Sequence, residues 1–82
     1  MFINKTGDGK NNICGQNVYV LRKKLGISQR ELSDRLQLVG LDVDKNAIQR
    51  IEAGKRFVTD IELLFLSKVL ETSLDELLKL KN

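Results

Sequence analysis

Three short segments of this chain carry the pattern that starts an α-helix, a Ser or Thr followed three residues later by Glu. In such a capping box the hydroxyl accepts a hydrogen bond from the backbone amide of the Glu, and the Glu carboxylate reaches back to the first amide. The segments are Ser28-Gln-Arg-Glu31, Thr59-Asp-Ile-Glu62 and Ser73-Leu-Asp-Glu76. They predict helices that begin near residues 29, 60 and 74.

Glycines and apolar spacing complete the outline of an all-α domain. Gly26 and Gly54 each follow an amphipathic stretch and suit the left-handed residue just beyond a helix end. Apolar residues three or four apart predict helices over residues 16–25, 29–37, 45–53, 60–71 and 74–80. We therefore predict a compact five-helix bundle without a sheet. The residues expected to face its core are Val18, Leu21, Leu25, Leu32, Leu36, Ile48, Ile51, Leu63, Leu66 and Leu70.

The length of the chain, 82 residues, suits one domain with one core. Residues 1–12 are polar and rich in Gly and Asn, so we expect a flexible N-terminal arm followed by a folded domain over residues 13–82. The longest apolar cluster is far shorter than the roughly 20 residues of a membrane span. No signal-peptide pattern opens the chain, which favours a cytoplasmic location.

The composition disfavours an enzyme. The chain has one cysteine, Cys14, and no histidine, so it lacks the parts of a zinc site, an internal disulfide and a Cys–His or Ser–His pair. Cys14 is expected to pack as a small apolar residue. We expect no catalytic residue, no metal and no cofactor.

Charge is unevenly distributed along the sequence. Residues 1–56 hold eleven Lys and Arg against six Asp and Glu, whereas residues 57–82 hold three against five. A basic first part would suit a surface that faces a polyanion such as nucleic acid. Mixed solvated surfaces often show the same imbalance, so charge alone is weak evidence.

The segment DKNAIQRIEAGKR, residues 44–56, combines an expected helix with a glycine stop and two further cations. One face of that helix would display Lys45, Asn46, Gln49 and Arg50. Such side chains can hydrogen-bond base edges and phosphates. An ordinary solvated helix would display the same residue types, so the pattern by itself leaves both interpretations open.

The order of several motifs resembles the XRE family of helix-turn-helix proteins, which includes phage repressors and Cro. The motifs are LRKKLGISQREL, then IQRIEAGKR, then SLDELL, and the resemblance covers roughly residues 13–80. It implies a lambda-repressor-like fold and a transcriptional regulator that binds double-stranded DNA, expected as a homodimer. The helix at residues 45–53 would then lie in the major groove.

The resemblance also implies roles for individual residues. Lys45, Asn46 and Gln49 would read base edges, and Arg50 would read a base or hold a phosphate. The DNA backbone would be contacted by Gln29, Lys55 and Arg56. An internal ion pair is implied between Arg22 and Glu52, whereas Lys23 and Lys24 are expected only to solvate the first helix.

The sequence departs from the family pattern in two places. The connection between the paired helices is usually about three or four residues, whereas LQLVGLDVDKN implies about five more on the family alignment. We expect a longer, packed connection over residues 38–43, with an extra turn on the preceding helix as one way to build it, because Leu38, Val39, Leu41 and Val43 are apolar. The second departure is Glu71, where relatives commonly have Gly, so that the preceding helix would end more tightly or extend further.

A protein-interaction module on the same fold, antitoxin-like or an adaptor, is the alternative to a DNA-binding regulator. Surplus apolar residues in the last two expected helices favour the homodimer, with a place in the core as the alternative for Leu64 and Phe65; they are Leu64, Phe65, Leu78 and Leu80. A steep salt dependence of DNA binding would distinguish the regulator from the interaction module.

Overall fold

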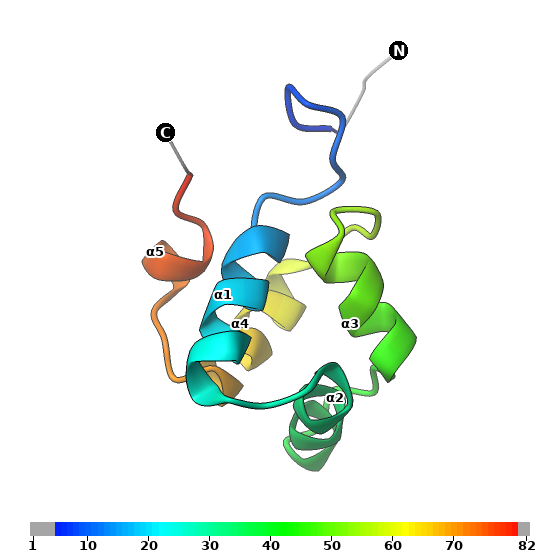
Figure 1. Ribbon diagram of the computed structural model, residues 1–82, viewed down its shortest axis with the longest axis vertical. Coiled ribbons are helices and arrows are strands. Elements are labelled where there is room, and N and C mark those ends of the chain that lie inside the picture. Colours follow the sequence, from blue (N-terminus) through cyan, green and yellow to red (C-terminus); the bar gives the residue numbers. More distant parts are fainter. Residues whose placement is uncertain (1–4, 81–82) are drawn as a thin grey trace.

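The computed structural model describes residues 5–80 and forms a single helical bundle (Figure 1). Its elements are α1 (Gly15–Leu25), α2 (Gln29–Leu38), α3 (Lys45–Glu52), α4 (Asp60–Val69) and α5 (Leu74–Leu77). Helix α1 packs against α3 and α5, and α2 packs against α3 and α4. Within the described range all regular structure is helical, so the predicted all-α, five-helix fold is confirmed.

The predicted helix starts are confirmed, but only one capping box is complete. The hydroxyls of Ser28, Thr59 and Ser73 each accept from the backbone amide of the Glu three residues on. At Thr59 the Glu62 carboxylate returns to the Thr59 amide at 2.9 Å. At Ser28 the Glu31 carboxylate instead accepts from Arg35, at 2.7 Å, one turn further along α2.

Helices α1 and α3 are each followed by a glycine with positive φ, whereas α4 is followed by a glutamate in that conformation. Gly26 and Gly54 take the left-handed conformation after α1 and α3, with φ of 71° and 75°, as predicted. Glu71 adopts the same conformation after α4, with φ of 56°. The Thr72 amide then reaches back to the Ser67 carbonyl at 2.9 Å, which closes the last turn in the usual way. Helix α4 therefore ends at Val69 and not at residue 71 as expected.

The core agrees with most of the predicted apolar residues. Those buried in it are Val18, Leu32, Leu36, Ile48, Ile51, Leu66 and Leu70, and the core is completed by Cys14, Ile27, Val43 and Leu77. Leu25 was expected to be buried but is exposed at the end of α1. Burial raises the pKa of the Cys14 thiol to about 11, which keeps it protonated and unreactive at neutral pH.

The connection between α2 and α3 is long, as predicted, but only its second half is packed. Helix α2 ends at Leu38 without an additional turn, and Gly40 reverses the chain. Val43 is buried, and its carbonyl accepts from the Gln37 side chain at 2.8 Å. The Leu38 side chain is 86% exposed and that of Val39 is 48% exposed. The expectation that both would pack inward is wrong. Leu38 lies in the last turn of α2 two residues after the buried Leu36, and so on the outer side of that helix.

The described part of the N-terminal segment is hydrogen-bonded to the bundle. Residues 5–12 form a turn that lies beside the end of α3 (Figure 1). The Asn11 amide donates to the Gly54 carbonyl at 2.7 Å, and its side chain donates to the Lys55 carbonyl at 3.0 Å. The flexibility expected for residues 1–12 stays a prediction. Residues 1–4, including Phe2 and Ile3, lie outside the described part of the chain.

Candidate nucleic-acid interface

Helix α3 has a buried apolar side and an exposed polar side. Asp44 begins the helix by accepting from the Ala47 amide at 2.8 Å. Ile48 and Ile51 fix the helix to the core, and both are almost fully buried. The opposite side is therefore directed to solvent, where the predicted base-reading residues are all exposed; these are Lys45, Asn46, Gln49 and Arg50.

An open depression of about 280 Å³ follows this exposed side of α3. Its lining consists of Asn46, Gln49, Arg50, Ala53 and Lys55. Amide side chains can each make two hydrogen bonds to adenine, and cations can donate to guanine or to phosphate. The structure thus brings three of the predicted base-reading residues together with Lys55 on one surface.

A second depression, of about 680 Å³, lies at the N-terminus of α2. Its lining is Arg22, Lys23, Gly26, Ile27, Ser28, Gln29, Arg30 and Lys45. Helix N-termini present free amides and a partial positive charge, which favours phosphate groups. Lys45 lines this depression at the start of α3, so the two depressions lie along one polar surface.

Two exposed cations of this second depression were not predicted to contact DNA from the sequence, where Lys23 was expected only to solvate the first helix. Arg30 is exposed at the start of α2, and Lys23 is exposed in the last turn of α1. Arg30 stands inside the capping box at Ser28, a position that directs it to the helix start and could have revealed it. Lys23 carries no such signal, because only the packing of α1 against α3 brings the end of α1 to this surface.

Gln29 takes part in an internal network as well as lining the depression. Its side-chain amide donates to Glu52 Oε1 at 3.0 Å. Arg22 donates to the same carboxylate at 2.6 and 3.1 Å, and to the Ile27 carbonyl at 2.9 Å. The hydrogen bonds that Arg22 donates to the Glu52 carboxylate raise the pKa of Arg22 above its ordinary value. The predicted Arg22–Glu52 ion pair is confirmed, and Gln29 is hydrogen-bonded to the same carboxylate.

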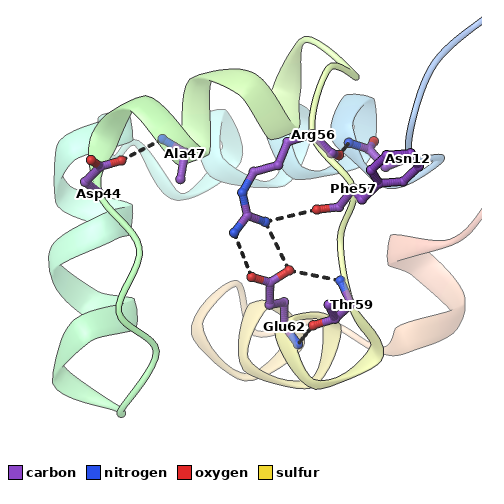
Figure 2. A network of polar contacts seen from close by, with 7 residues as sticks. All are labelled: Asn12, Asp44, Ala47, Arg56, Phe57, Thr59 and Glu62. Atoms are coloured by element: carbon purple, nitrogen blue, oxygen red, sulfur yellow. Dashed lines mark hydrogen bonds and ion pairs between the residues drawn. The ribbon is translucent and has the colours of Figure 1, made fainter.

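Lys55 and Arg56 are adjacent in sequence but lie in different surroundings. Lys55 is exposed beside α3. Arg56 turns towards α4, where its guanidinium makes two hydrogen bonds to Glu62, at 3.0 and 2.9 Å, and one to the Phe57 carbonyl (Figure 2). This pairing lowers the pKa of Glu62 and raises that of Arg56. The structure therefore separates two cations that the sequence analysis grouped together.

The range of residues 5–80 contains no group of three or more His, Cys, Asp or Glu side chains that could hold a metal ion. None of its helices has the length and apolar character needed to cross a membrane.

Two solved structures resemble the chain closely. The P22 c2 repressor protein, in complex with a synthetic operator, superposes with a TM-score of 0.70 at 34% identity, covering 83% of this chain and 96% of that one. The restriction-modification controller protein C.AhdI from Aeromonas hydrophila gives a TM-score of 0.68 at 28% identity, covering 78% of this chain and 86% of that one. No curated protein matches the sequence.

The helix-turn-helix family model HTH_3 matches residues 18–77, which contain all of α2 to α5 and most of α1. All residues that line the two depressions, from Arg22 to Lys55, fall within that range. The chain therefore belongs to the helix-turn-helix family and is a sequence-specific, DNA-binding transcriptional regulator of the XRE type.

Proposed function

We propose that α3 enters the major groove of the operator and that α2 crosses the adjacent backbone. Lys45, Asn46 and Gln49 then read base edges, and Arg50 reads a base or holds a phosphate. The observation that carries this assignment is the exposed polar side of α3, which continues into the cationic depression at the start of α2. Base contacts specify the sequence, whereas backbone contacts set position and affinity.

The backbone contacts in this proposal come from α2 and from the end of α3. Gln29 contributes through its free backbone amide at the helix start and through its side chain held by Glu52. Lys55 is the cation after α3 that remains exposed. Arg56 is assigned to the connection between α3 and α4, since its guanidinium is already bonded to Glu62 and Phe57.

The regulator is proposed to act as a homodimer in the cytoplasm. Of the apolar residues expected to be in surplus, Leu64 is 51% exposed, Leu78 37% and Leu80 68%, whereas Phe65 packs against the core. The three exposed side chains in α4 and the C-terminal segment are available to a second copy. Two recognition helices would then contact half-sites about 34–36 Å apart, one turn of DNA.

An in vitro selection of bound duplex sequences, followed by a salt series, tests this function. On the selected operator, Asn46→Ala or Gln49→Ala should weaken binding by about 1–3 kcal/mol and relax the choice of base at one position. Lys55→Ala should weaken binding to all sequences alike and reduce the log–log salt slope by about 0.9. Identical behaviour of the two kinds of variant would contradict the division into base-reading and backbone residues.

A protein-interaction role is the outcome that would replace this proposal. Leu38 and Val39, which are exposed at the end of α2, would be available to such a partner. Failure of the wild-type protein to bind duplex DNA at low salt would favour that role.

A further inference from the structure

The N-terminal segment is hydrogen-bonded to the backbone at the end of α3, the proposed recognition helix. Residues 6–10 form a closed turn in which the Lys10 amide donates to the Thr6 hydroxyl at 2.9 Å. Asn11 follows and makes two bonds beyond α3, from its backbone amide to the Gly54 carbonyl and from its side chain to the Lys55 carbonyl. The segment before α1 thus contacts the backbone that carries Lys55.

Asn12 joins three parts of the molecule through one side-chain amide. Its Oδ1 accepts from the Gly15 amide at 2.8 Å, at the start of α1. Its Nδ2 donates to the Ile51 carbonyl at 3.1 Å, in the last turn of α3, and to the Arg56 carbonyl at 2.7 Å. All the polar atoms of this partly buried side chain are therefore used.

Carbonyls in the last turn of a helix lose their intrahelical partners and need others. The Ile51 carbonyl accepts from the Gly54 amide at 3.0 Å, and Asn12 supplies its second hydrogen bond. The backbones of α1 and α3 also approach closely here, because a Cβ added at Gly15 would overlap the Ile51 carbonyl group. Asn12 fills the remaining space between the two helices with hydrogen bonds and so determines how the end of α3 sits against α1.

The Asn12 contacts extend to α4 through Arg56. Asn12 binds the Arg56 carbonyl, while the guanidinium of the same residue is paired with Glu62 at the start of α4 (Figure 2). The loop that carries Lys55 is therefore held on both sides, by Asn12 from the N-terminal segment and by Glu62 from α4. Neither of these residues belongs to the two depressions of the candidate interface.

We propose that Asn12 is a positioning residue for DNA binding. It holds the last turn of α3 and the loop after it in the arrangement in which the base-reading side and Lys55 contact one duplex together. Asn12 does so through the Ile51 and Arg56 carbonyls and does not itself touch DNA. The inference rests on the proposed docking of α3 in the major groove.

The central experiment measures operator affinity of the full chain carrying Asn12→Ala. Without the two carbonyl bonds, the end of α3 samples other orientations, and apparent affinity falls by the fraction of molecules that remain competent. If that fraction is one in five to one in ten, the dissociation constant rises about five- to tenfold. An unchanged dissociation constant would overturn the proposal.

Asn17 offers a matched control elsewhere in the bundle. Its side-chain amide also donates two hydrogen bonds to carbonyls, those of Leu77 and Lys79, at 2.7 and 2.8 Å. Asn17→Ala therefore removes the same kind and number of donor bonds but leaves α3 untouched. We expect it to lower stability without changing affinity for a single half-site, where the proposed dimer contact of Leu78 and Leu80 plays no part, at a temperature where both variants are folded. Equal losses of affinity for the two variants would reduce Asn12 to a general structural role.

The salt dependence separates positioning from direct contact. Because Asn12 neutralises no phosphate, Asn12→Ala should keep the wild-type salt slope, whereas Lys55→Ala should reduce it by about 0.9. A smaller slope for Asn12→Ala would place Asn12 on the DNA and overturn the proposal. Asn12→Ser, whose hydroxyl can still accept from the Gly15 amide, provides a variant with the start of α1 preserved.

Hydrogen exchange provides a readout that does not depend on DNA. In free Asn12→Ser, the amides of Gly54 and Lys55 should exchange faster than in the wild type, because they close the last turn of α3. Unchanged protection there would contradict the positioning role even if affinity fell. If the protection of these amides falls in Asn12→Ser but the wild-type protein binds no DNA, the proposed docking of α3 is wrong, whereas the role of the Asn12 hydrogen bonds in holding α3 stands.

Discussion

Two arginine–glutamate pairs hold the recognition helix, and they differ in depth and span. Arg22–Glu52 joins α1 to α3 across thirty residues of sequence, with side chains 8% and 7% exposed. Arg56–Glu62 closes the connection between α3 and α4 across six residues, with side chains 29% and 13% exposed. The deeper pair fixes the helix to the scaffold, whereas the shallower one shapes the loop that follows it.

Removing one partner of the deeper pair should have the largest effect. Glu52→Ala leaves Arg22 charged and shielded from water, and it also frees Gln29. We expect a loss of about 3–5 kcal/mol in the free energy of unfolding, measured by urea denaturation. Glu31→Ala, which breaks the exposed pair with Arg35, is the control and should cost about 0.5 kcal/mol or less. Similar losses in the two variants would show that burial does not distinguish the pairs.

The shallower pair should contribute less to stability. Arg56→Ala removes two charge-assisted hydrogen bonds from Glu62, yet part of the Arg56 side chain already meets water. We expect a loss of about 1–2 kcal/mol by the same measurement. In DNA binding, its salt slope should stay closer to the wild type than that of Lys55→Ala. A log–log salt slope reduced by about 0.9 would instead show that Arg56 contacts a DNA phosphate, as first expected from the sequence.

Acid should weaken the shallower pair in a predictable direction. Hydrogen bonding from Arg56 lowers the pKa of Glu62 below its ordinary value of 4.5. The stability that this carboxylate contributes is therefore present above that ordinary value and is lost as pH falls through the lower folded-state pKa. Glu62→Gln keeps a residue suited to the capping box but cannot ionise. Its unfolding free energy should fall less steeply than that of the wild type below about pH 4.5. Parallel curves would contradict the assignment.

A substitution at Glu71, outside both pairs, should have the smallest effect on stability. It also tests whether the end of α4 is independent of the Arg56–Glu62 pair. Glu71 pays for a left-handed conformation that glycine adopts freely, so Glu71→Gly should stabilise the protein by about 0.5–1 kcal/mol. The gain should be the same in the wild type and in Arg56→Ala, because no hydrogen bond or ion pair within residues 5–80 joins Glu71 to Arg56 or Glu62. A gain that depends on the background would show that the end of α4 and the Arg56–Glu62 pair are coupled.

Much of the fold could be predicted because its signals are local. Ser28, Thr59 and Ser73 begin helices through bonds to residues three positions away, and Gly26 and Gly54 end helices through their own backbone conformation. The polar side of α3 was predictable for the same reason, since helical geometry alone places Asn46, Gln49 and Arg50 on the side away from Ile48 and Ile51. The Arg22–Glu52 pair was anticipated from resemblance to a family and not from spacing.

What the sequence by itself determined is the set of helices and the polar side of α3, because both depend on interactions within a few residues. Tertiary structure alone decided the surroundings of Arg56, the exposure of Leu38 and the bonds of Asn12. Each of these depends on which backbone lies opposite a side chain, at a distance set by the packing of α1, α3 and α4. Adjacent residues such as Lys55 and Arg56 can then point to different partners, one to solvent and the other to Glu62.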